Sequence, residues 1–212
     1  MSRFKTEDAL VLRTRACGES NREAFFLTGG QGIIRAIVYG GPKSKLRAMV
    51  SPFHSGVVYL YHDPVRDSYK VSDFDVRFWH PGIRENYERT MAAGALCETI
   101  LAGHGGGFWR EALDLACAVF AALEDAGTEL CSSIVVYFLW KWAELLGVRP
   151  EFPRNAALSY SSAIRWLYTL EPLELSALNN HIPDGGTLCT AKNLCMDILA
   201  AAFGRRLPSW NW

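Results

Sequence analysis

The chain has 212 residues, half of them apolar and 21% charged, and its 22 basic and 22 acidic side chains give a formal net charge of zero. The sequence holds no low-complexity segment, and no apolar run approaches the roughly 18 residues that a membrane-spanning helix needs. We therefore expect a soluble globular protein with no membrane partner, and a chain of this length can bury a sizeable core in one large or two small domains.

The charge is distributed unevenly. Residues 1–62 contain nine lysines and arginines against four acids, a net charge of +5, which leaves −5 for the remainder. A basic first third predicts that this part of the chain meets an anion, while the acidic remainder has another task.

The first 80 residues show period-2 alternation with turn residues between short apolar runs, which is typical of strands. The expected strands are 7–17, 23–28, 33–39, 52–61 and 69–78. Five such strands predict a small closed or partly open barrel. Basic and aromatic side chains on its surface would suit single-stranded nucleic acid, although most of the aromatic side chains are expected to fill the barrel.

A basic segment follows the third expected strand. Gly40–Pro42 breaks the strand, and Lys43, Lys45 and Arg47 then occupy every second position. In an extended loop these three side chains would point the same way. Because no acid lies between Glu23 and residue 63, we expect the cations to gather on one side of the barrel with nothing to neutralise them, which suits phosphates. The alternative is a solvated hairpin tip.

From residue 83 onward the apolar period is helical. The expected helices are 87–101, 109–126, 128–146, 159–170, 172–179 and 190–203. Ile134–Trp140 is apolar all round and predicts the core of a bundle. Trp140, Trp142 and Trp166 are expected in this core, although a groove for the tail of a partner is an alternative for some of them.

Six cysteines could pair as disulfides, but the length of the chain and the apolar helical setting of several of them favour free thiols. They are Cys17, Cys97, Cys117, Cys131, Cys189 and Cys195. With no secretory leader before Glu7, we expect a reducing cytoplasm.

Several short motifs follow one another in the first quarter of the chain. They are Ala9–Arg15, Gly18–Arg22, Leu27–Thr28, Gly32, Gly40–Ala48 and Pro52–Phe53. In this order and spacing they resemble the RecO family of bacterial recombination mediators, and Leu145–Gly147 and Gly185–Cys189 agree more loosely.

The resemblance implies an α+β protein with an N-terminal five-stranded OB-fold over residues 1–80 and a C-terminal all-helical domain over residues 81–212. It also implies a protein of the RecF pathway that binds and anneals single- and double-stranded DNA, works with RecR, and helps RecA replace single-stranded DNA-binding protein. The DNA contacts carried over from the family are Arg13, Arg15, Arg22, Arg35, Lys43, Lys45 and Arg47, with Gly32 and Gly40 as structural residues.

One departure from the family concerns zinc. Many members hold it with two Cys-x-x-Cys pairs, and such a site needs four ligands. Here Cys189 is followed by Thr190, Ala191 and Lys192, and no cysteine follows Pro150 where the first pair is expected. We therefore expect no zinc and no other cofactor, with packing between Arg154 and the last helices in place of the metal.

An enzyme is poorly supported, because the five histidines are scattered and Gly105–Gly107 lacks the Gly-Lys-Ser/Thr of a phosphate loop. Two hypotheses remain. The first is a non-enzymatic mediator that binds and anneals DNA. The second is a protein-interaction scaffold for RecR and single-stranded DNA-binding protein with weak DNA affinity of its own, which the acidic C-terminal two-thirds favours.

Overall fold

The computed structural model describes residues 3–41, 43–104, 107–151 and 161–210. The chain divides into two compact units, of which the first comprises Met1–His80 with His104–Cys117 and the second comprises Pro81–Gly103 with Ala118–Trp212. The division into domains at residue 80 stays a prediction. Arg154 and the glycines at 105 and 106 lie outside the described residues, as does the beginning of the helix expected over 159–170.

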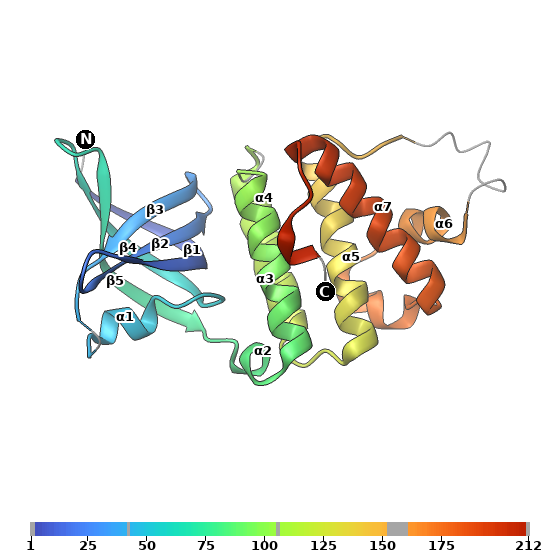
Figure 1. The fold of residues 1–212 in the computed structure, drawn as a ribbon, viewed down its shortest axis with the longest axis horizontal. Helices are drawn as coiled ribbons and strands as arrows, with labels where there is room; N and C mark the ends of the chain where they lie inside the picture. The colour runs from blue at the N-terminus through green and yellow to red at the C-terminus, as the bar shows by residue number, and fades with distance from the viewer. Residues whose placement is uncertain (1–2, 42, 105–106, 152–160, 211–212) are drawn as a thin grey trace. The chain divides into compact units, whose positions relative to one another are not determined.

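The first unit is built around five strands that close into a barrel (Figure 1). Its elements are β1 (Phe4–Cys17), β2 (Asn21–Thr28), β3 (Gly32–Val38), α1 (Lys45–Met49), β4 (Ser55–Asp63) and β5 (Ser68–Phe78). The strand order is β1-β2-β3-β5-β4, and β3 and β5 close the barrel as a parallel pair through Ala36 with Tyr69 and Ile37 with Lys70. A five-stranded barrel followed by helices confirms the expected fold class.

The interior of the barrel follows from strand alternation. In β2, Ala24 and Phe26 are fully buried in the core, whereas Phe25 between them is turned outward and partly exposed. Phe26 meets Phe74 of β5 edge to face, with ring centroids 5.9 Å apart. Burying such side chains is the main favourable contribution to folding of the barrel.

Two glycines are required by the geometry of the strands. Gly32 opens β3 with a φ of +70°, a conformation that a residue with a Cβ adopts at a cost. Gly56 lies in β4 where the register with β5 shifts, and a Cβ there would stand 2.0 Å from the carbonyl oxygen of Asp75. Gly32 thus permits the backbone conformation at the start of β3, and Gly56 lets β4 and β5 approach each other closely.

The second unit is helical. Its elements are α2 (Pro81–Glu85), α3 (Tyr87–Ala102), α5 (Thr128–Leu145), α6 (Ser162–Thr169), the 3-10 helix η2 (Leu175–His181), α7 (Gly185–Phe203) and the 3-10 helix η3 (Pro208–Trp210), while α4 (Trp109–Leu123) contributes to both units. Within the described ranges, the structure has no helix long and apolar enough to cross a membrane.

Capping side chains fix the start of two helices, one where it was predicted and one earlier than predicted. The helix expected over 87–101 agrees with α3, and Asn86 caps it because its side chain accepts a hydrogen bond from the amide of Arg89. The last long helix begins at Gly185 rather than at residue 190, since Asp184 caps it through the amide of Thr187. The helix expected over 172–179 is a 3-10 helix, Leu175–His181.

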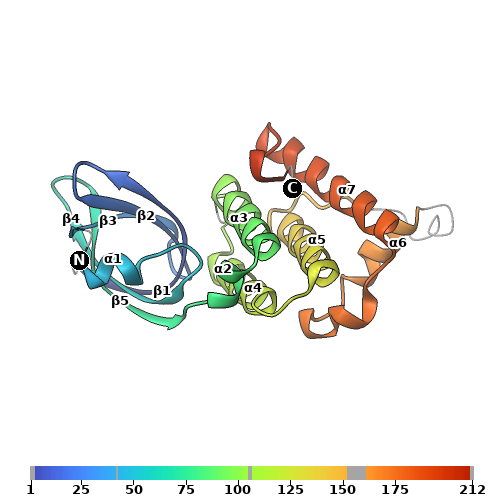
Figure 2. The same cartoon turned by 60° about the horizontal axis from the view of Figure 1, so that its bottom comes forward.

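The core of the second unit forms around α5, which lies between α3 and α7 (Figures 1 and 2). Every residue of Ile134–Trp140 is buried, which confirms the expected bundle core. Trp140, Trp142 and Trp166 are buried as well, and Trp142 stacks on Phe138 with ring centroids 5.3 Å apart. These tryptophans are core residues and do not line an open groove.

All six cysteines are free thiols in the structure, and their burial predicts their reactivity. Burial raises the pKa of the Cys131 thiol to about 11 and raises the pKa values of Cys97 and Cys195 as well. Because the thiolate is the nucleophile, DTNB at mildly alkaline pH is expected to label exposed Cys189 rapidly and to label these three only on unfolding. Peptide mass spectrometry with and without urea provides the measurement, and rapid labelling of Cys97 or Cys195 in the native protein would contradict it.

Candidate nucleic-acid interface

Two arginines and a phenylalanine align across the outer face of β1, β2 and β3. Arg13 lies opposite Phe25, and Phe25 lies opposite Arg35. The guanidinium carbon of Arg13 stands 4.6 Å from the centre of the Phe25 ring, and that of Arg15 stands 5.5 Å from it. The ring therefore holds two cations over its surface by cation–π attraction.

A buried carboxylate fixes the guanidinium groups beside this ring. Glu23 pairs with Arg15 through Nε of the arginine, and its other oxygen lies 3.2 Å from Nε of Arg35. The Glu23 side chain is only 8% exposed, whereas those of Arg15 and Arg35 are 56% and 66% exposed. The two arginines are thus oriented from beneath while their outer edges stay open to solvent. We call Arg13, Arg15 and Arg35 the arginine cluster.

The expectation that nothing negative neutralises the gathered cations is wrong for the arginine cluster. Glu23 compensates one of its three charges and leaves a net charge of +2. The carboxylate also lowers the freedom of the guanidinium groups, so less conformational entropy is lost when they bind an anion.

The basic segment after β3 differs from its prediction. Lys45 is the first residue of α1, so Lys43, Lys45 and Arg47 do not form an extended loop. Successive helical residues are about 100° apart, which sends Lys45 and Arg47 in nearly opposite directions. Lys43 and Lys45 are exposed, whereas Arg47 is half-buried and donates to the carbonyl oxygen of Ser20 at 3.4 Å. The prediction that these three cations face one partner is therefore wrong.

The remaining predicted contact, Arg22, does not join the arginine cluster. Arg22 lies opposite Ala16 and Val38, and by strand alternation it shares the inner face of β2 with Ala24 and Phe26. Its half-buried side chain is placed at the end of the barrel. Of the predicted contacts, the structure brings together Arg13, Arg15 and Arg35 on one outer face.

A second surface, which the sequence reasoning missed, combines lysine with aromatic rings. The ammonium group of Lys70 stands 5.7 Å from the ring centre of Tyr61 and 5.8 Å from that of Tyr39. Phe4 meets Tyr61 edge to face at 5.4 Å. We call Phe4, Tyr39, Tyr61 and Lys70 the tyrosine–lysine cluster.

The expectation that most aromatic side chains fill the barrel is wrong. Phe26 and Phe74 are buried inside it, whereas Phe4 and Tyr39 are 68% and 48% exposed. In β4, Leu60 alternates with Tyr59 and Tyr61. This pattern indicated outward-facing tyrosines, because a strand that turns its aliphatic side chains inward turns the alternate side chains outward. The sequence reasoning missed Phe4 because it placed the start of the first strand at residue 7, whereas β1 begins at Phe4.

A polar network lies behind the tyrosine–lysine cluster. Lys5 donates to the Gln31 side-chain oxygen at 2.6 Å and to the Tyr69 hydroxyl at 2.7 Å. The side-chain amide nitrogen of Gln31 in turn donates to the Glu7 carboxylate at 2.9 Å. These bonds tie the first residues of β1 to the β2–β3 turn and to β5, and so hold Phe4 in place.

The predicted absence of zinc stays a prediction. Within the described segments, no group of three or more His, Cys, Asp or Glu residues could hold a metal ion. The segment that resembles the approach to a cysteine pair is the first turn of α7, where Cys189 is exposed and Cys195 is buried. Burial lowers the pKa of Lys192, which lies between them in the sequence.

A closed five-stranded barrel with a short helix between its third and fourth strands defines an OB-fold-like domain. Residues 1–77 match the family model described as "Recombination protein O N terminal". The N-terminal domain of this chain is therefore similar to the N-terminal domain of RecO proteins.

A curated relative shows the same similarity. The DNA repair protein RecO of Bifidobacterium animalis subsp. lactis (strain AD011) is 33% identical over 95 residues. The match covers 44% of this chain and 39% of that protein, so it spans about two fifths of the length of the relative.

Proposed function

We propose that this protein is a DNA-binding recombination mediator of the RecF pathway in DNA repair and that it acts without enzymatic chemistry. The observation that carries the proposal is the arginine cluster, in which a ring and a buried carboxylate hold three guanidinium groups on the outer face of an OB-fold-like barrel. The match of residues 1–77 to the RecO N-terminal model supports the pathway.

The chemistry of the cluster suits phosphates. Guanidinium groups donate paired hydrogen bonds to phosphate oxygens, and an array across neighbouring strands can meet successive phosphates. Phosphates occur in both forms of DNA, so we propose that the protein binds single- and double-stranded DNA and anneals complementary single strands.

The partners belong to the same proposal. We propose that the protein works in the cytoplasm with RecR and with single-stranded DNA-binding protein, and that it helps load RecA. The similarity of the N-terminal domain to RecO proteins supports these partners, while the arginine cluster supports only the DNA.

The test is the salt dependence of DNA binding by the full chain. Fluorescence anisotropy with a labelled oligothymidine is expected to give a dissociation constant that rises steeply with salt. Each phosphate contact to a single strand contributes a slope of about −0.7 in log K against log salt, so three arginine contacts give about −2. A flat dependence, or no measurable binding at low salt, would contradict the proposal. Weak DNA binding with retained capture of purified RecR and single-stranded DNA-binding protein would favour the scaffold instead.

A further inference from the structure

The pairing of neighbouring strands places the arginine cluster in a row that continues around the barrel. Arg15 of β1 lies opposite Glu23 of β2, and Glu23 lies opposite Ile37 of β3. Ile37 is then level with Lys70 in the parallel pair of β3 and β5. Paired residues on antiparallel or parallel strands turn toward the same face. Arg15 and Lys70 are therefore two positions of one outer row.

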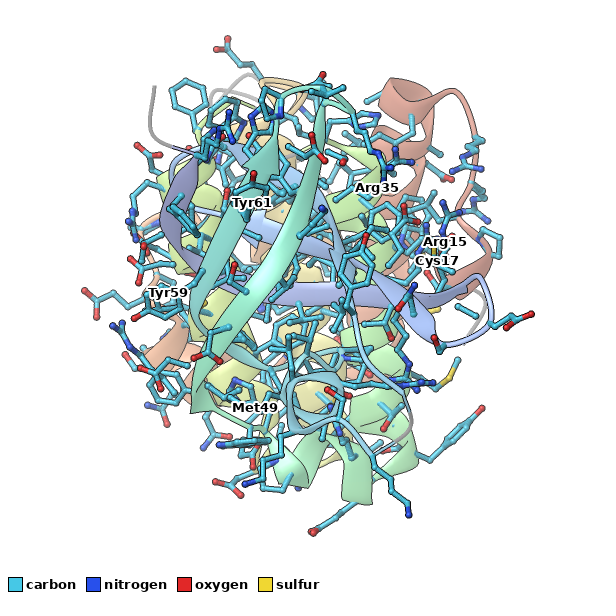
Figure 3. All side chains as sticks on the ribbon, turned by 90° about the vertical axis from the view of Figure 1, so that its left-hand side faces the viewer. Arg15, Cys17, Arg35, Met49, Tyr59 and Tyr61 are labelled. Carbon is cyan, nitrogen blue, oxygen red and sulfur yellow. The ribbon has the colours of Figure 1, made fainter. Side chains whose placement is uncertain are left out.

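From Lys70 the row continues into the aromatic rings. Lys70 lies opposite Tyr61 of β4, and Tyr61 lies opposite Phe4 of β1. Figure 3 looks onto this side of the barrel and shows Arg35 and Tyr61 on either side of β5. The arginine cluster and the tyrosine–lysine cluster thus lie along one outer row, in which Ile37 and Lys70 join them.

We propose that this surface is a track for one single strand of DNA, in which the arginine cluster binds phosphates and the rings of the tyrosine–lysine cluster stack on bases. The inference rests on the proposed function and adds the base-stacking residues to it. It also orders the contacts along the strand, from the arginines at one end to Phe4 at the other.

The exposed rings favour a single strand over a duplex. Phe4 and Tyr39 present much of their surface to solvent, and a flat ring gains most from a base whose face is free. Bases in a duplex are already stacked on one another, whereas those of a single strand are available to side chains.

The positive net charge of the surface favours nucleic acid over an uncharged ligand. Its cations are Arg13, Arg15, Arg35 and Lys70, and the carboxylates paired with them are Glu23 and Asp63. These named groups leave a net charge of +2. The row crosses all five strand gaps at about 4.8 Å each and so follows a path of about 24 Å around the barrel, from Arg15 back to Phe4 of the same strand, which suits a segment of a few nucleotides.

The test compares ring variants of the full chain on an oligothymidine and on a hairpin duplex. Tyr61→Ala is expected to weaken binding of the oligothymidine about fivefold or more, because that is the lower end of the range for loss of one stacked base. The slope against salt should stay unchanged, because the ring carries no charge. Tyr61→Phe keeps the ring and is expected to bind like the wild type.

Two further variants keep the test decisive. Tyr39→Ala removes an exposed ring of the track and gives the same readout if Tyr61→Ala fails to fold. Tyr87→Ala removes an even more exposed tyrosine at the start of α3 and is the matched control, expected to leave binding unchanged.

Three outcomes would overturn the track. They are wild-type affinity of Tyr39→Ala and of a folded Tyr61→Ala for the oligothymidine, an equal loss on the duplex, or an equal loss in Tyr87→Ala. In each case the wild-type protein still binds DNA with a salt dependence, so the proposed function stands. Failure of the wild type to bind any DNA would instead remove the proposed function and the track together.

Discussion

Replacing Arg13, Arg15 and Arg35 together with alanine is expected to weaken binding to an oligothymidine about 100-fold at low salt. A charge-assisted contact to a phosphate contributes roughly 1 kcal/mol or more, so three contacts amount to about 3 kcal/mol. The slope of log K against log salt should also fall by about two, since three contacts with a single strand are lost. Anisotropy titrations of both proteins over a series of salt concentrations measure the two quantities.

The control for this variant carries three arginine substitutions elsewhere. Arg165, Arg205 and Arg206 are exposed in the second unit, and their replacement by alanine changes the net charge by the same amount. An equal loss of affinity in both triple variants would show that overall charge, not the arginine cluster, determines binding.

A lysine variant separates charge from geometry. The alanine variant leaves the buried carboxylate of Glu23 without its two arginine partners. Thermal unfolding of that variant is therefore measured alongside binding, to show that the barrel still folds. Replacing the arginine cluster with three lysines keeps the charge but loses the planar guanidinium, and intermediate affinity is expected. Wild-type affinity of the lysine variant would show that oriented guanidinium groups are not needed.

Replacing Phe74 with alanine is expected to lower the free energy of unfolding of the barrel by about 3–5 kcal/mol. The Phe74 side chain is fully buried, and its loss removes apolar contacts, among them the edge-to-face contact with Phe26, and leaves a cavity between β5 and β2. Hydrogen exchange followed by mass spectrometry measures the change in the barrel peptides separately from the helices. Ser72→Ala, at an exposed position of the same strand, is expected to leave exchange unchanged. A similar protection of barrel amides in the wild type and in Phe74→Ala would contradict the prediction.

The strands and part of the arginine cluster were predictable from local sequence. Alternation in β1 places Arg13 and Arg15 two residues apart on one face, and the structure keeps them together there. The role of Glu23 was not predictable, because it depends on the register of three strands rather than on any spacing along the chain. Distant residues meet in a sheet only once its register is known.

The errors also have physical causes. The helix α1 has five residues, too short for an apolar period to show, so Lys45 and Arg47 were placed in an extended loop. The start of α7 was readable, since Asp184 three residues before Thr187 is a capping pattern. The resemblance of the following segment to a cysteine loop concealed it.

The shortest strand pairing of the barrel, between β3 and β5, lies at the middle of the outer row. In the described part of the chain, β3 and β5 are joined through two residue pairs, Ala36 with Tyr69 and Ile37 with Lys70, whereas β4 and β5 are paired along the whole length of β4. Spontaneous opening of the barrel is therefore expected to begin with the separation of β3 from β5. A DNA strand bound across these two strands opposes that separation, so the free energy of opening rises as more of the protein is bound to DNA.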